Sequence, residues 1–233
     1  MAICLRRHQK STWFFEADKR VAISLKKGQG VSLKKSENDF SMVTIGLGWD
    51  IMEEKPGFFG GLFAKKPAEY DLDVVAFLCG TDGKVHDLGK MENNRPSLVN
   101  GDVVFFNNMR HHSGHVWLTG DNRTGTGEGD DEQIIVKLNE LPEKYARVVF
   151  VVQIYKGIEN GQSFGRVRNA FIRAVDAKGR EMTRFDLSGG AQYAECRSVL
   201  FAEIVRERDG WKFNAIGAPS ESDTFVEFLK QYV

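Results

Sequence analysis

Short hydrophobic segments, each closed by a turn signal, constrain the fold of this chain most strongly. In several of them apolar and polar residues alternate, as in residues 21–25, 134–138 and 211–215. A period of two residues is typical of strands with one buried face. Other segments are continuous apolar runs, which are typical of strands buried on both faces. These runs cover residues 42–47, 74–78, 103–106, 148–155 and 199–205.

Turn-forming dipeptides separate these segments, among them Asp82-Gly83, Asn100-Gly101 and Asn160-Gly161. Such pairs favour tight turns between strands. We therefore expect about eight to ten strands, and two packed sheets are the natural way to cover them. The sequence predicts an all-β dominated fold, namely a two-sheet β-sandwich with minor helical turns.

The last segment has a different period. Its apolar residues are spaced as on one face of a helix, at Phe225, Phe228, Leu229 and Tyr232. This spacing predicts a C-terminal helix over residues 220–232, and Ser220 with Asp223 resembles a capping box at its start. We expect the apolar face to pack on the sandwich, with docking to another subunit as the alternative. A weaker helical turn is predicted at residues 163–169.

A chain of 233 residues suffices for one large β domain. We assign residues 1–19 to an N-terminal extension and residues 20–233 to a single domain. Within that domain, residues 53–69 are an inserted loop rich in glycine, proline and apolar side chains, including Phe58, Phe59, Leu62 and Phe63. Aromatic residues in such numbers either cap an open end of the sandwich or contact a protein partner or an acidic membrane surface.

Charge and cysteine content exclude several classes of protein. Lysine and arginine number 32, and aspartate and glutamate also number 32. This balance argues against a nucleic-acid partner, which needs a basic face. The chain has neither a secretory signal pattern nor a run of roughly 20 apolar residues that could span a membrane. Its three cysteines are too scattered for a disulfide framework. We expect a cytoplasmic protein with reduced thiols.

One loop carries the strongest chemical signal. Residues 120–132 read GDNRTGTGEGDDE and hold five carboxylates. Like charges this close repel one another unless a cation or water screens them. Carboxylate, amide, hydroxyl and carbonyl oxygens form the donor set that calcium prefers, whereas zinc favours histidine or cysteine. The spacing is not that of an EF-hand. The alternative is a solvated acidic hairpin between the strands at residues 116–118 and 134–138.

A second acidic pair, Asp71 and Asp73, opens the strand of the run at residues 74–78. Residues two apart on a strand point to the same face, so the two carboxylates are expected to lie side by side. Such a pair is costly without a cation, and a sandwich can bring this strand end beside the acidic loop. The alternative is an exposed polar face on an edge strand.

Three histidines, His111, His112 and His115, lie just before the acidic loop. We interpret them as surface histidines whose charge rises near pH 6. Binding of a transition metal or an oxyanion is the weaker alternative. No catalytic triad or phosphate-binding loop is found in a supporting context, because the Gly28-Gln29-Gly30 turn is not followed by a helix.

A set of short motifs also occurs in a fixed order along the chain: Gly46-Leu47-Gly48-Trp49-Asp50, Tyr70-Asp71-Leu72-Asp73, Val104-Phe105-Phe106-Asn107-Asn108, the acidic loop at 120–132, Gly161-Gln162-Ser163-Phe164, Asn169-Ala170-Phe171-Ile172-Arg173 and Trp211-Lys212-Phe213. Together they resemble the TerD family of bacterial tellurite-resistance and stress-response proteins. The acidic loop is the most specific of these motifs.

The resemblance implies a β-sandwich that holds two calcium ions at loops on one end, cytoplasmic residence, and a role in resistance to tellurite or other chemical stress. Carried over by position, it implies calcium ligands at Asp71, Asp73, Asp121, Asn122, Asp130, Asp131 and Glu132. Further candidates are Asn107 and the carbonyl groups of Thr124, Gly127 and Gly129.

We therefore predict a non-enzymatic calcium-binding stress-response protein that acts as a binding or scaffold module, with no catalytic residues. One alternative is a metal-dependent hydrolase or phosphate-handling enzyme, in which the cation acts as a Lewis acid. Another is a calcium-dependent module that docks on a membrane surface or on a protein.

Overall fold

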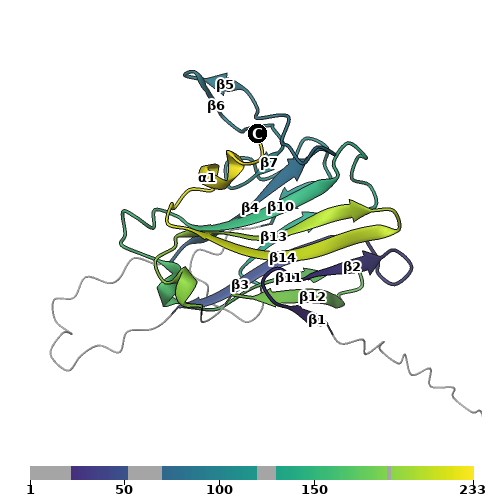
Figure 1. The fold of residues 1–233 in the computed structure, drawn as a ribbon. Coiled ribbons are helices and arrows are strands. Elements are labelled where there is room, and N and C mark those ends of the chain that lie inside the picture. The colour runs from purple at the N-terminus through teal and green to yellow at the C-terminus, as the bar shows by residue number, and fades with distance from the viewer. Residues whose placement is uncertain (1–21, 52–69, 120–129, 188–189) are drawn as a thin grey trace, which may run out of the picture.

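The computed structural model describes residues 22–51, 70–119, 130–187 and 190–233. Two six-stranded sheets pack face to face (Figure 1). Sheet A has the strand order β1-β12-β11-β3-β9-β8, and sheet B has the order β2-β14-β13-β10-β4-β7. A separate two-stranded ribbon, β5-β6, and the helix α1 lie on the outer side of sheet B in Figure 1. The predicted all-β dominated two-sheet fold is confirmed.

The strands of sheet A are β1 (Ile23–Leu25), β3 (Val43–Ile51), β8 (Val116–Leu118), β9 (Glu132–Val136), β11 (Val167–Val175) and β12 (Glu181–Asp186). Those of sheet B are β2 (Gly30–Lys34), β4 (Leu72–Cys79), β7 (Val103–Val104), β10 (Arg147–Ile154), β13 (Ser198–Glu207) and β14 (Gly210–Ser220). The remaining elements are β5 (Met91–Glu92), β6 (Arg95–Pro96), η1 (Phe164–Arg166), η2 (Ala191–Tyr193) and α1 (Val226–Leu229). All described sheet neighbours are antiparallel except β1 and β12, which are parallel.

The continuous apolar runs belong to strands of sheet B that are buried on both faces. All eight residues of β4 are buried. Leu72 and Val74 belong to the core between the sheets, whereas Val75 and Phe77 belong to a second cluster on the outer face. Alternate side chains of one strand therefore enter different cores, which is why the sequence shows no alternation there.

Three strands of the two large sheets, β2, β11 and β12, were not predicted. In β11 the inner residues Ile172 and Ala174 alternate with Phe171 and Arg173. The register shifts between Arg168 and Phe171, so a bulge interrupts the period of two. The helical turn predicted at residues 163–169 is only the short η1, after which the chain enters β11 directly.

The C-terminal helix exists but is shorter than predicted. The expected span of 220–232 is wrong, because Ser220 still pairs with Ser198 in the sheet. The predicted capping box does not form either. Thr224 Oγ1 accepts the N–H of Val226 at the start of α1 at 3.3 Å, and the Asp223 carboxylate accepts a hydrogen bond from the Ile158 N–H at 3.0 Å. The packing of the apolar face is confirmed, since the Phe225 ring lies 5.4 Å from that of Phe105.

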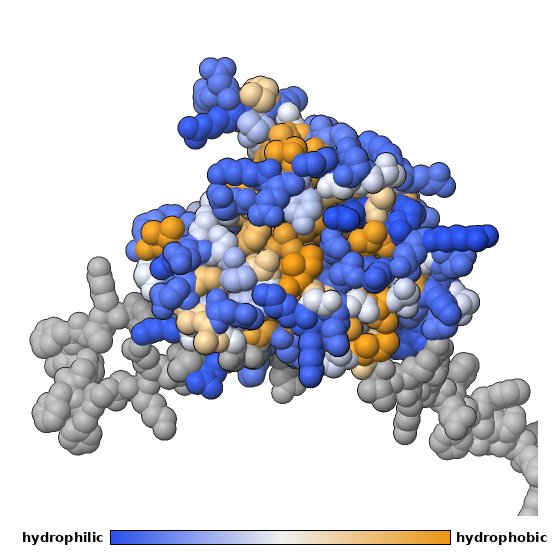
Figure 2. All heavy atoms as spheres, viewed as in Figure 1, coloured by the Kyte–Doolittle hydropathy of each residue, from blue (hydrophilic) through white to orange (hydrophobic). Residues whose placement is uncertain are grey.

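Among the described residues, no helix is long and apolar enough to cross a membrane. On the face shown in Figure 2, hydrophobic side chains occur in groups separated by hydrophilic ones. The predicted N-terminal extension and the loop at 53–69, with its apolar residues Phe58, Phe59, Leu62 and Phe63, lie outside the described residues.

Replacing a buried ring of α1 tests whether this short helix closes the outer core. Phe228 is 5% exposed, so Phe228→Ala is expected to lower the free energy of unfolding by about 3–5 kcal/mol. Val226, in the same helix, is 40% exposed, and Val226→Ala is expected to change it by less than about 0.5 kcal/mol. Urea denaturation with unchanged m values measures both. Equal effects of the two substitutions would contradict the packing.

Candidate functional site

The candidate site lies at the end of the sandwich where β4 and β9 begin. Strand β7 pairs only with Ala76 and Phe77 of β4, so the edge of β4 is left open near Val74. Glu132, the first residue of β9, reaches across from sheet A and accepts the Val74 N–H at 2.6 Å. Its side chain is buried at this point, and the residue is 2% exposed. A carboxylate therefore replaces a strand partner and joins the two sheets.

Asp131 is held beside the end of β3. Its N–H donates to the Leu47 carbonyl at 2.7 Å, and its carboxylate accepts the Trp49 N–H at 2.9 Å. Burial raises the pKa of Asp131, and the nearby anions Asp50 and Asp130 raise it further, against the opposing effect of the Trp49 hydrogen bond. A divalent cation at this place would reverse that electrostatic penalty.

Asp73 links the site to the C-terminal helix. It is 8% exposed and lies opposite Gln153 in the β4-β10 register. The Gln153 amide donates to the Asp73 carboxylate at 3.1 Å, and its oxygen accepts the Phe225 N–H at 2.7 Å. Asp71 precedes β4, and its carbonyl accepts the Tyr155 N–H at 2.8 Å. The two predicted acidic residues of this strand thus lie at the same sheet end as Glu132.

Asp130 is anchored by protein groups on the outer face of sheet A. Arg173 donates to its carboxylate at 2.7 Å, and Gln133 donates at 3.2 Å. Arg173 also donates to Glu181 at 3.0 Å. A Cβ at position 46 would overlap the Asp130 carboxylate, which explains why Gly46 stands there. The structure therefore gives Asp130 an anchoring role, while its predicted role as a metal ligand stays a prediction.

Sequence reasoning missed the partners that hold this end together. Besides Arg173, these include Asn169, whose amide donates to the Asp50 carboxylate at 2.6 Å from a left-handed backbone with φ of 51°. Arg173, Asn169 and Asp50 all lie in the short motifs that carry the family resemblance, and those motifs were the only sequence signal for these contacts. The remaining candidate, Asn107, is exposed and follows Phe106, whose ring lies 6.0 Å from that of Tyr155.

The rest of the predicted ligand set lies outside the described residues, namely Asp121, Asn122, Thr124, Gly127 and Gly129. Among the described residues, the acidic side chains at this end form no group of three with their ligand atoms all within 4.8 Å. The described residues therefore supply only part of the predicted ligand set, and residues 120–129 precede Asp130 in the chain.

The prediction that the three histidines lie on the surface is wrong for His111. This residue is 1% exposed, and its ring lies 3.1 Å from the Asp102 carboxylate and edge-on to the Tyr145 ring. The sequence could not show this, because Asp102 and Tyr145 come from other segments of the chain. His112 is exposed, and His115 is half-buried with its ring 3.6 Å from the Glu140 carboxylate.

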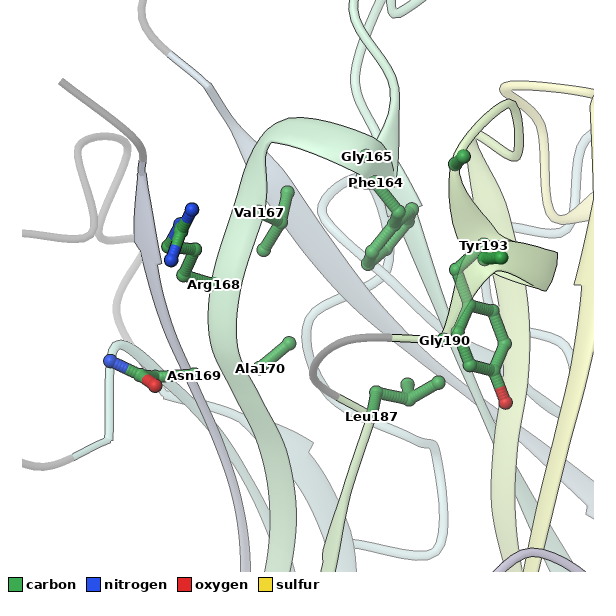
Figure 3. A pocket seen from close by; sticks show the side chains of 11 residues that line it. Phe164, Gly165, Val167, Arg168, Asn169, Ala170, Leu187, Gly190 and Tyr193 are labelled. Atoms are coloured by element: carbon green, nitrogen blue, oxygen red, sulfur yellow. The ribbon is translucent and has the colours of Figure 1, made fainter. Parts of the chain in front are cut away.

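A pocket of about 420 Å³ lies between β11 and η2 (Figure 3). Phe164, Val167 and Tyr193 face it, whereas Arg168 and Asn169 extend from the other side of β11. The Tyr193 hydroxyl donates to the Gly217 carbonyl at 3.0 Å. The described residues that line the pocket include no carboxylate, histidine or cysteine.

The two cysteines within the described residues, Cys79 and Cys196, are both buried and free. Burial raises the pKa of each thiol to about 12. Since the thiolate is the reactive form, both side chains are poor nucleophiles and poor metal ligands in the folded protein at neutral pH.

A double-mutant cycle tests the anchor of the acidic loop. Arg173→Gln leaves a buried carboxylate without its cation, and we expect it to lower the free energy of unfolding by about 1–3 kcal/mol. Adding Asp130→Asn removes the stranded charge and should recover part of that loss. Lys156→Gln, which breaks an exposed ion pair with Glu159, is the control and should cost less than about 1 kcal/mol. Strictly additive effects of Arg173→Gln and Asp130→Asn would show that the pair is not coupled.

Comparison with known proteins shows which family the chain resembles. A TerD domain matches residues 21–232. The tellurium resistance protein TerX of Serratia marcescens is 65% identical over 213 residues, which is 91% of this chain and 100% of that protein. The stress response protein SCP2 of Bacillus subtilis (strain 168) is 36% identical, again over 91% of this chain and 100% of that protein.

Solved structures agree on the fold. The unknown-function protein SAV2460 matches with a TM-score of 0.57 and 26% identity over 81% of this chain and 94% of that one. A homologue of the telluride resistance protein TerD from Streptomyces coelicolor A3(2) matches in fold, with a TM-score of 0.56 and 24% identity over 81% and 95% of the two chains. From the domain match and these relatives, the chain belongs to the TerD family of tellurium resistance and stress response proteins.

Proposed function

We propose that this protein binds calcium at the β4-β9 end of the sandwich and acts in the stress response as a binding or scaffold module rather than as an enzyme. The observation that carries the proposal is the environment of Asp131. Its carboxylate is held in a half-buried position beside two other anions, with a raised pKa. A fold that gathers anions in this way is under strain unless a cation joins them.

The donor chemistry fits calcium. The side chains that reach this end from β4 and β9 are carboxylates, and calcium takes oxygen ligands in a flexible arrangement. Asp71, Asp73, Asp131 and Glu132 are the described residues that would hold the two ions, together with the predicted ligands among residues 120–129. Asp130 would support them from outside, because Arg173 and Gln133 already bind its carboxylate.

Calcium at this place would supply positive charge beside side-chain hydrogen bonds that already link neighbouring elements. Glu132 connects β9 with β4 through the Val74 N–H. Asp131 connects the acidic loop with β3 through the Trp49 N–H. Asp73 connects β4 with the start of α1 through Gln153. Calcium binding would thus stiffen one end of the sandwich and the loops beside it, which suits a docking surface.

The relatives support the assignment to stress response, and we extend to this chain the role in tellurium resistance that the name of TerX carries. A binding role is also supported by the pocket beside η2, whose described lining includes the hydrophobic side chains of Phe164, Val167 and Leu187. A cytoplasmic location is part of the same proposal.

Calorimetry with chelator-treated protein is the direct test. We expect two calcium equivalents with a Kd on the order of 10⁻⁷–10⁻⁵ M, the range of sensor-like sites. Asp131→Asn keeps an acceptor for the Trp49 N–H but loses the charge, so at least one Kd should rise about tenfold or more. Asp186→Asn, an exposed acid on β12, is the control and should leave both unchanged. No heat at millimolar calcium would end the proposal.

Thermal stability and protection of cells against tellurite should both depend on calcium binding. An ion that binds only the folded chain adds about 2.7 kcal/mol at a hundredfold excess over Kd, so the Tm should rise with calcium and fall with chelator. In a tellurite-sensitive bacterial strain, the parent chain and Asp186→Asn should protect growth, whereas Asp131→Asn should not. If Asp131→Asn protected growth fully although its calcium binding is weakened, tellurite resistance would not depend on calcium binding.

A further inference from the structure

Two histidines and one aspartate form a compact cluster that the calcium proposal does not use. Asp102, His111 and His112 each offer one ligand atom, and these three atoms all lie within 4.8 Å of one another. It is the one group of this kind among the residues that the structure describes. Asp102 and His111 are buried, and His112 is exposed.

The cluster is separate from the acidic end of the sandwich. The Asp102 carbonyl accepts the Leu78 N–H near the end of β4, whereas Asp71 and Asp73 lie at its beginning. His111 donates its N–H to Val116 at the start of β8, whereas the acidic loop follows the end of that strand. A ligand bound at the cluster would therefore be independent of calcium at the loop.

The spacing of the buried pair suits a single metal ion. The His111 Nε2 and Asp102 Oδ1 atoms are 3.1 Å apart, and the two side chains are 0% and 4% exposed. Two ligands on one tetrahedral ion at about 2.0–2.1 Å lie roughly 3.3 Å from each other. The His112 ring, with its centroid 4.1 Å from that of His111, adds a third ligand on the solvent side, where an ion could enter.

The surrounding groups orient these ligands as the outer partners of metal sites do. Ser113 contacts the His111 Nδ1 atom through its hydroxyl at 2.8 Å and its N–H at 3.2 Å. Tyr145 donates to Asp102 Oδ1 at 2.6 Å, and the Asp87 N–H donates to Oδ2 at 3.1 Å. Burial acts to raise the pKa of Asp102, but hydrogen bonds from His111, Tyr145 and Asp87 outweigh it and keep the carboxyl ionised.

We propose that Asp102, His111 and His112 bind one divalent transition-metal ion of the zinc type, with a remaining coordination position open to solvent. Two imidazoles and a carboxylate are a ligand set for zinc, nickel or copper rather than for calcium or magnesium. Because the Ser113 N–H donates to Nδ1, the ring proton of His111 lies on Nε2. That proton leaves to solvent when the ion takes its place.

The same contacts could instead serve the fold alone, as a buried His-Asp-Tyr hydrogen-bond network that holds the turn at 111–115. In that case His112 would have no role and no ion would bind. The two roles differ in what the exposed His112 contributes, so a substitution at this position separates them without removing a buried group.

The test is a zinc titration of the chelator-treated full chain, carried out in saturating calcium so that the acidic loop does not take the zinc. We expect one zinc equivalent by calorimetry and, with cobalt in place of zinc, the visible absorption of a four-coordinate site. His112→Ala should weaken zinc binding at least about tenfold. His86→Ala, at an exposed histidine beside Asp82, and His115→Ala, within the same segment, should bind zinc as the parent does.

A thermal melt of each variant without zinc checks that His112→Ala is folded like the parent. Added zinc should then raise the Tm of the parent, His86→Ala and His115→Ala, but not that of His112→Ala. The proposal is overturned if the calcium-saturated parent binds no zinc, or if His112→Ala binds it as tightly as the parent. It is overturned equally if His86→Ala or His115→Ala loses the zinc, because the ion would then sit elsewhere on the surface.

Discussion

A buried carboxylate contact joins the two sheets at the end that holds the candidate site. Glu132 of sheet A accepts the N–H of Val74 at the edge of β4 that β7 leaves open. Without it, a buried backbone donor of sheet B would need another acceptor. The contact also fixes where the acidic loop rejoins the sandwich, because Glu132 is the first residue of β9. The hydrogen bond between Glu132 and the Val74 N–H therefore both joins the two sheets and positions the start of β9.

Around this contact, the acidic residues divide into two kinds. Asp130 faces outward over Gly46, and a guanidinium neutralises it. Asp131 stays beside other anions and has a raised pKa. Neighbouring residues of one acidic run thus have opposite electrostatic environments. The environment of Asp130 suits a side chain that positions the neighbouring residues. The environment of Asp131 suits a side chain that a cation would stabilise.

Sheet B carries a second structural layer that reaches the candidate site. Its outer face is covered by α1, whose Phe225 and Phe228 pack in the outer cluster. Gln153 donates to Asp73 and accepts the Phe225 N–H, so one side chain connects the acidic end with the start of the C-terminal helix. The cluster of Asp102, His111 and His112 lies near the other end of β4. The two proposed metal sites are therefore separate in the fold.

The sequence by itself determined the β-sandwich class, the buried runs and the family, because these depend on local periodicity and on short motifs in a fixed order along the chain. It did not determine β2, β11 or β12; in β11 a bulge after Arg168 breaks the period of two. Nor did it determine the length of α1, because Ser220 pairs in the sheet.

Only the tertiary structure decided that Arg173 anchors Asp130 and that His111 is buried against Asp102 and Tyr145. The partners in these contacts lie between 9 and 43 residues apart in the chain. Burial and pairing at such separations are set by how the strands are ordered across the two sheets, and local sequence patterns do not encode that order.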